Sequence, residues 1–214
     1  MKKVILLIIG IVVMGGFFWG LQGSNEVNKK QVINLNPLAT VKLGNGQTFK
    51  IELYPDQAPN TVNNFIALVN SNYYNNLTFN KMIPDYIVQT GDRIGDGTGF
   101  PGYFIRSECS DNGYENNISL EEGTVCMSRG QKYNTEGSQF FILLSPRRDL
   151  EGKYTAFGKV IEGLEFLKEI SRVVPDELVQ REEGIEISRI EVNTFGKPYE
   201  EPQVLSLAEV RELP

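Results

Sequence analysis

One uncharged stretch stands out in this sequence, Gly137-Ser138-Gln139-Phe140-Phe141-Ile142-Leu143-Leu144. Aromatic and branched side chains dominate it, a polar run precedes it, and Pro146 follows shortly after its end. This pattern is typical of a strand inside a closed sheet. Gln139 carries the only amide in the stretch, and a buried amide must find hydrogen-bond partners. We therefore expect Gln139 either to bond a neighbouring loop or to face a groove and meet the backbone of a bound peptide.

The composition of the chain excludes several kinds of chemistry. Its 214 residues allow one domain with a sizeable core and additional segments. The net charge of −6 argues against a nucleic-acid partner, which a basic face would bind. The chain has no histidine, which excludes Ser-His-Asp and Cys-His nucleophiles as well as histidine-ligated metals. Two cysteines, Cys109 and Cys126, cannot form a four-thiolate zinc site, so we expect neither a metal nor a cofactor.

The N-terminus predicts a membrane anchor. Lys2 and Lys3 precede an uncharged run of eighteen residues, Val4 to Leu21, which is nearly long enough to span the hydrocarbon layer as a helix. The two lysines would hold that end in the cytoplasm and place the rest of the chain outside it. We expect a single-pass protein of the cell membrane; secretion after signal cleavage is the alternative. Outside the cytoplasm a Cys109–Cys126 disulfide is permitted, and two packed free thiols are an equal alternative.

The remaining sequence predicts a mainly β domain. Its short alternating or apolar segments, separated by turn signals, number about eight, and only two segments have helical periodicity. We expect a closed eight-stranded antiparallel barrel capped by two α-helices. The predicted strands are 39–43, 48–53, 77–83, 86–90, 123–127, 137–144, 155–160 and 185–192, and the helices begin near Ala58 and Leu164. The predicted organisation is an anchor at 1–23, a polar linker at 24–38, this domain at 39–196, and an acidic tail without assigned role at 197–214.

Several motifs in this order and spacing resemble one known family. They are Phe79-Asn80-Lys81-Met82-Ile83-Pro84, Gln89-Thr90-Gly91-Asp92, Gly95-Asp96-Gly97-Thr98-Gly99, Gly137-Ser138-Gln139-Phe140-Phe141-Ile142, and Leu150-Glu151-Gly152-Lys153-Tyr154-Thr155-Ala156-Phe157-Gly158-Lys159-Val160. From about Ala39 to Phe195 the chain resembles the cyclophilin family of peptidyl-prolyl cis–trans isomerases. The resemblance implies an eight-stranded barrel with two helices and catalysed rotation about X-Pro bonds.

Rotation about a peptide bond needs no nucleophile, which suits a chain without histidine. The barrier of about 18–20 kcal/mol comes from the loss of amide resonance. A protein lowers it with an apolar pocket for the proline ring, groups that hold the flanking backbone, and a donor aimed at the prolyl nitrogen. Because the nitrogen lone pair becomes available only as conjugation is lost, that donor favours the transition state selectively.

The resemblance also assigns roles to individual residues. It implies that Lys81 is the donor and that Gln89 contacts the substrate backbone and orients the donor. Gln139 would reach the peptide from the central strand. The proline pocket would be lined by Tyr86, Ile87, Phe141 and Leu150. The groove beside the preceding residue would be lined by Ser128 and Arg129, and the Tyr154 hydroxyl would face the substrate carbonyl.

Two positions depart from the family pattern. Lys81 replaces the usual catalytic arginine and lacks its planar fork, so we expect reduced but measurable activity. Asp149 stands where relatives often carry tryptophan or histidine, and it could pair with Arg147, Arg148 or Lys81. We expect a monomer that acts on proline-containing segments of exported or surface proteins. The alternative is a catalytically weak proline-segment binding module or chaperone.

Overall fold

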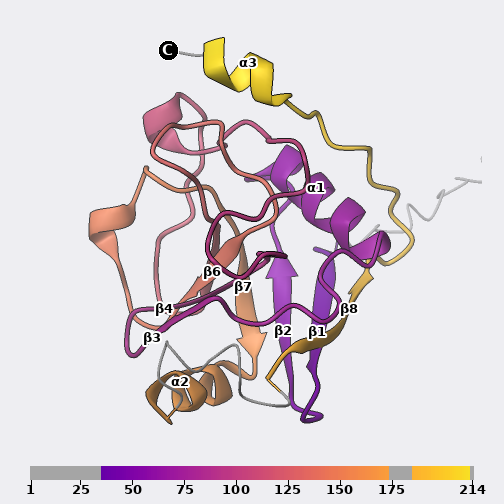
Figure 1. Ribbon diagram of the computed structural model, residues 1–214, viewed down its shortest axis with the longest axis vertical. Coiled ribbons are helices and arrows are strands. Elements are labelled where there is room, and N and C mark those ends of the chain that lie inside the picture. The colour runs from indigo at the N-terminus through magenta and orange to yellow at the C-terminus, as the bar shows by residue number, and fades with distance from the viewer. Residues whose placement is uncertain (1–34, 174–184, 213–214) are drawn as a thin grey trace, which may run out of the picture. The chain divides into compact units, whose positions relative to one another are not determined.

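The computed structural model describes residues 35–173 and 185–212 (Figure 1). The described residues belong to one compact unit, Asn34–Pro214. The predicted anchor and most of the predicted linker lie outside the described residues. Among the residues that are described, no helix is long and apolar enough to cross a membrane.

A single antiparallel sheet of eight strands forms the domain, in the order β3-β4-β6-β5-β7-β2-β1-β8. Because β6 lies between β4 and β5, the stretch from Gly137 to Leu144 contains an internal strand, as its apolar character predicts. The strands are β1 (Leu38–Leu43), β2 (Thr48–Leu53), β3 (Lys81–Ile83), β4 (Ile87–Thr90), β5 (Thr124–Met127), β6 (Phe140–Leu143), β7 (Ala156–Glu162) and β8 (Ile187–Asn193).

The prediction of a closed barrel is wrong. In the described residues no ladder joins the outer strands β3 and β8, and the sheet is a half-barrel. One isolated bridge, Leu77 to Ile187, spans the opening. The predicted strand 77–83 shortens to the three residues of β3, and before it the Thr78 carbonyl accepts a hydrogen bond from the Thr90 hydroxyl at 2.8 Å.

The two predicted helices are present as α1 (Pro59–Asn70) and α2 (Leu164–Val173), which lie toward opposite ends of the sheet (Figure 1). The residue before α1 is Ala58, which has no side chain to cap the helix. Glu108, far along the chain and only 4% exposed, accepts the backbone N–H groups of Asn60 and Thr61 at 3.0 and 2.8 Å and so replaces the missing cap. Three short elements were not predicted: the 3₁₀ turns η1 (Ser110–Asn112) and η2 (Arg148–Leu150), and α3 (Leu207–Glu212).

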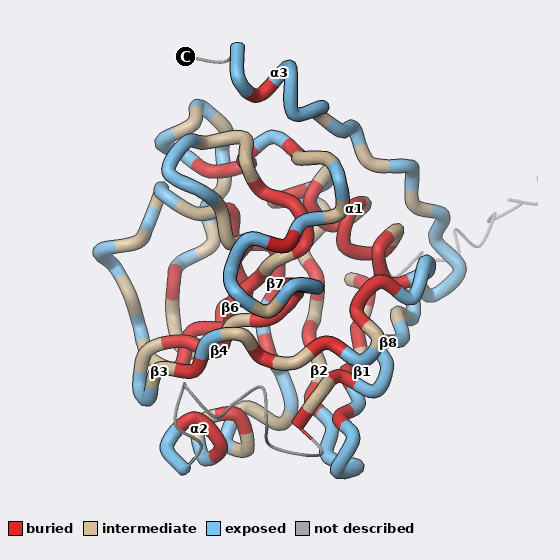
Figure 2. The backbone as a smooth tube through the Cα atoms, viewed as in Figure 1, coloured by how far each residue is buried: buried red, intermediate tan, exposed pale blue. Residues whose placement is uncertain are grey.

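The sheet separates two apolar clusters, and this separation creates the site. Phe140 and Ile142 of β6 face the main core, where Phe140 packs edge-on against Phe65 of α1. Phe141 and Leu143, the alternate residues, face the opposite side and join a smaller cluster. Figure 2 shows the buried backbone concentrated along the central strands. The period of two along β6 therefore divides core residues from residues available to a surface groove.

Candidate active site

Three predicted site residues form a row across neighbouring strands. Lys81 of β3 lies directly opposite Gln89 of β4, and Gln89 lies directly opposite Phe141 of β6. Residues paired in this way share one face of a sheet. The row therefore places a cation, an amide and an aromatic ring side by side on the face away from the main core.

A hollow of about 500 Å³ lies over this row. It is lined by nine of the ten residues that the sequence assigned to the site: Lys81, Tyr86, Ile87, Gln89, Ser128, Arg129, Phe141, Leu150 and Tyr154. The tenth, Gln139, lines an adjoining hollow of about 370 Å³. We refer to the two as the first and the second hollow.

The floor of the first hollow is apolar. Phe141 is 4% exposed and Ile87 is 6% exposed, and both belong to the smaller cluster, which also contains Leu143. Tyr154 meets Phe141 edge-on, with 5.3 Å between ring centroids. A floor packed in this way offers an apolar surface to a small saturated ring.

The glutamine side chains form a network between the two hollows. The Gln89 side-chain amide donates to Gln139 Oε1 at 2.9 Å. The Gln139 amide in turn donates to the carbonyls of Gly97 and Gly99, both at 2.9 Å. The expected hydrogen bond from Gln139 to a neighbouring loop is therefore present, and its contact with a bound peptide stays a prediction. With its amide nitrogen bonded to the loop, Gln139 presents its Oε1 atom to Gln89 and so holds the Gln89 side chain in place.

The glycine-rich loop that receives Gln139 is built around a buried carboxylate. Asp92 is 3% exposed and accepts the backbone N–H groups of Ile94 and Gly99 at 2.8 and 2.9 Å, and also that of Gly97. A Cβ added at Gly99 would lie 2.0 Å from Asp92 Oδ1, so only glycine allows this approach. The carboxylate thus fixes the loop that positions the glutamine network.

The opposite rim carries a rigid arginine. Arg129 donates from Nε to the Lys153 carbonyl at 3.0 Å, and its guanidinium lies 4.4 and 4.9 Å from the ring centroids of Tyr133 and Tyr154. Held by these contacts, Arg129 acts as a wall of the hollow, and Lys81 is an exposed cation on the facing strand.

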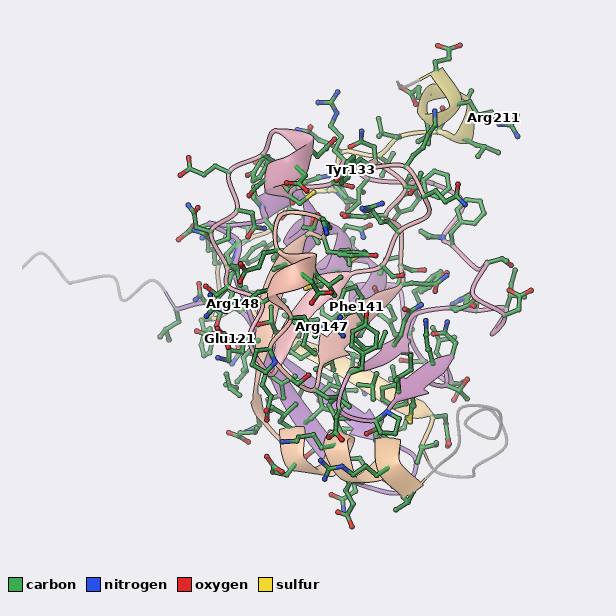
Figure 3. All side chains as sticks on the ribbon, turned by 90° about the vertical axis from the view of Figure 1, so that its left-hand side faces the viewer. Glu121, Tyr133, Phe141, Arg147, Arg148 and Arg211 are labelled. Atoms are coloured by element: carbon green, nitrogen blue, oxygen red, sulfur yellow. The ribbon has the colours of Figure 1, made fainter. Side chains whose placement is uncertain are left out.

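Asp149 pairs with Arg147, one of the three partners that the sequence allowed. Arg147 donates to both carboxylate oxygens at 2.8 and 2.7 Å and lies 4.0 Å over the Tyr86 ring. These hydrogen bonds lower the pKa of Asp149. Figure 3 labels Arg147 and Phe141 on the face turned toward the reader. The pair neutralises the carboxylate at the rim and covers one side of the aromatic wall.

Comparison with known proteins decides the family. The family model described as cyclophilin type peptidyl-prolyl cis-trans isomerase/CLD matches residues 38–192. The chain belongs to the cyclophilin-type peptidyl-prolyl cis–trans isomerases. It is 44% identical over 129 residues to peptidyl-prolyl cis-trans isomerase B of Bacillus subtilis, a match that covers 60% of this chain and 87% of that protein. It is 39% identical over 132 residues to human peptidyl-prolyl cis-trans isomerase-like 3, covering 62% of this chain and 81% of that protein.

A solved structure supports the same assignment. The crystal structure of a Cryptosporidium parvum cyclophilin-type isomerase in the presence of the dipeptide Ala-Pro has a TM-score of 0.64 and 32% identity. The match covers 73% of this chain and 98% of that one. The cyclophilin described here thus has additional segments beyond the shared domain.

Sequence reasoning missed several features of this cyclophilin's site. Asn80, Gly95, Asp96 and Gly97 also line the first hollow. The Asn80 side chain donates to Gln139 at 3.4 Å, and its Oδ1 atom is buried without a hydrogen-bond partner among the described residues. All four lie inside the quoted motifs, which was the available signal. The two cysteines are free buried thiols, and burial raises the pKa of both; of the two alternatives, the structure has packed thiols.

Proposed function

We propose that this cyclophilin accelerates X-Pro isomerisation in exported or surface polypeptides, with Lys81 as the donor to the prolyl nitrogen. The observation that carries the proposal is the row of Lys81, Gln89 and Phe141 across three strands. The proline ring packs on Phe141 and Ile87. The Lys81 ammonium is then two strands away from the Phe141 ring, on the same face of the sheet. The Gln89 side chain lies on the strand between them.

The transition state is stabilised by binding groups, and no covalent step occurs. As the X-Pro bond twists, resonance is lost and the prolyl nitrogen becomes a hydrogen-bond acceptor. The Lys81 ammonium donates to that nitrogen only in the twisted state, which lowers the barrier without stabilising the planar substrate. Gln89, held by Gln139, contacts the substrate backbone beside the bond. Upstream residues of the peptide pass Ser128 and Arg129, which belong to both hollows.

A lysine donor gives a weaker catalyst than an arginine. An ammonium is a flexible point charge, whereas a guanidinium donates through a planar fork that can bond a glutamine and a substrate together. Each tenfold loss in rate corresponds to about 1.4 kcal/mol of transition-state stabilisation. Lys81 also supports a second candidate, a module that binds proline segments without turning them over rapidly.

The place of action follows from the N-terminal sequence. Lys2 and Lys3 before the apolar run at 4–21 support a cell-membrane anchor with the domain outside the cytoplasm. Protease added to intact cells would then degrade the domain, while a cytoplasmic marker survives. Protection of the domain until the membrane is opened would contradict this topology.

Exchange NMR of an Ala-Pro peptide with the full-length chain in detergent tests the activity. We expect faster cis–trans exchange, which Phe141→Ala reduces by roughly 30- to 100-fold because it removes a ring that buries the proline. Phe166→Ala, on α2 outside the hollows, serves as the control for loss of an aromatic side chain. Peptide binding without faster exchange would instead establish the binding module.

A further inference from the structure

The C-terminal segment of this cyclophilin, residues 196–212, lies beyond the part that the family model matches. We call it the C-terminal strap. It follows β8 along the domain and ends in α3 (Figure 1). Although the sequence is acidic and contains proline, this segment is tied down at several points. Val210 of α3, for example, is only 6% exposed.

Two pairs of hydrogen bonds fasten the strap. The Asn60 side chain donates to the Gln203 carbonyl at 2.9 Å and accepts the Gln203 backbone N–H at 2.7 Å. Leu205 and Phe104 exchange backbone hydrogen bonds of 2.7 and 2.9 Å, which form an isolated β-bridge. The first pair anchors the strap to α1, and the second pair connects it to the loop beside the second hollow.

Phe104 is part of the wall of the second hollow. Its ring stacks on that of Phe100, with centroids 4.9 Å apart and an interplanar angle of 6°. Both rings line the hollow, and Phe100 remains 41% exposed. The loop that carries them lies outside the eight strands, and its next residue, Ile105, forms an isolated bridge with Glu136. The bridge to Leu205 supplies the two backbone hydrogen bonds of Phe104 itself.

We propose that the C-terminal strap is a specificity-determining element of the substrate groove. By holding Phe104, it fixes the aromatic pair that an upstream residue of the peptide meets. The inference rests on the proposed function, because the second hollow receives peptide only if the first hollow receives the proline. The two hollows share Gln89, Gly97, Ser128 and Arg129, so one extended chain can occupy both.

The strap therefore selects for peptides with an aromatic side chain upstream of the proline. A fixed aromatic pair offers a preformed partner for such a ring, and a mobile one must first be ordered. We expect the full-length chain to prefer peptides with an upstream phenylalanine over those with alanine at the same place by about fivefold in the rate of catalysed exchange.

The test compares three peptides in the exchange assay: a short Ala-Pro peptide, and two longer ones with phenylalanine or alanine upstream. Three variants perturb the strap. The first is a chain that ends at Gly196. The second, Leu205→Pro, removes the backbone N–H that donates to Phe104, and the third, Asn60→Ala, removes the side chain that anchors the strap to α1. Asn63→Ala, the same change on the same helix without a bond to Gln203, is the control. Amide hydrogen exchange of Phe104 reports whether the bridge has opened.

We expect the strap variants to lose the fivefold preference, with the exchange of the short peptide changed by less than about twofold. The Phe104 amide should lose protection in the chain ending at Gly196. An unchanged preference in a folded variant whose Phe104 amide exchanges freely would overturn the inference. A similar loss for all three peptides would also overturn it, because the strap would then act on stability alone. Absence of catalysis on the short peptide by the unmodified chain would refute the proposed function instead.

Discussion

Glu136 gives this cyclophilin a pH-dependent stability that can be worked out from its surroundings. The side chain is fully buried, and its Oε1 atom accepts a hydrogen bond from the Thr155 hydroxyl at 2.8 Å. Oε2 is buried without a hydrogen-bond partner among the described residues. Burial is the main reason why the pKa rises from 4.5 to about 8; the bonds from Thr155 and Ser107 oppose it, as does the Arg129 charge, and the charge of Glu108 adds to it.

The sign of the effect follows from proton binding. Between the unfolded pKa near 4.5 and the folded pKa of about 8, the folded chain keeps a proton that the unfolded chain has released. The contribution of Glu136 to the free energy of unfolding is therefore fully present below pH 4.5 and is lost as the pH rises toward about 8. At 1.36 kcal/mol per unit, the free energy of unfolding falls by roughly 2–3 kcal/mol between pH 5 and pH 7.

Urea unfolding of Glu136→Gln measures this contribution. Glutamine has the same shape, retains an acceptor for Thr155 and does not ionise. We expect the variant to match the unmodified chain at pH 5 and to exceed its stability by about 3–4 kcal/mol at pH 8. Glu169→Gln on the exposed face of α2 is the matched control and should leave the pH dependence unchanged. Parallel stability curves for Glu136→Gln and the unmodified chain would refute the reasoning.

Three further predictions concern groups that position the fold. Asp92→Asn places an amide N–H against backbone N–H groups of the glycine-rich loop. We expect the free energy of unfolding, measured with urea, to fall by about 2–3 kcal/mol. Asp96→Asn, at an exposed position of the same loop, is the control. Glu108→Gln weakens the cap of α1, which should cost about 1–2 kcal/mol in the same assay; an unchanged midpoint would show that the capping bonds are dispensable. Cys109, whose pKa burial raises to about 11, and Cys126 should react with a thiol reagent at pH 8 only after unfolding, and rapid reaction of the native chain would contradict their burial.

Local sequence patterns predicted the sheet well because its two faces differ in composition. The continuous apolar run of β6 and the alternation in β8 are readable without neighbours. Closure of the barrel was wrongly predicted because it depends on pairing between β3 and β8, which lie far apart in sequence, and no pattern within either strand records that pairing. The cap of α1 by Glu108 was missed for the same reason, since 48 residues separate donor and acceptor in sequence.

The site shows the same division. Nine of ten assigned residues line one hollow, because the resemblance to the family covers the motifs and also the segments between them. Gln139 differs because its bonds are to Gly97 and Gly99 of another loop, and no pattern within β6 could decide between a loop and a peptide as its partner. The strap was left without a role because its acidic composition does not indicate the backbone bridge that Leu205 makes.

The central claim is that a lysine in the row with Gln89 and Phe141 is the donor to the prolyl nitrogen, and exchange NMR of Lys81→Arg tests it most directly. The assay uses the full-length chain and one Ala-Pro peptide at saturating concentration, with Lys159→Arg on β7 as the matched control. We predict that Lys81→Arg raises the catalysed exchange rate by about tenfold, a gain of about 1.4 kcal/mol in the transition state, with little change in peptide affinity. An unchanged rate in a variant that still binds the peptide would contradict the assignment of the donor.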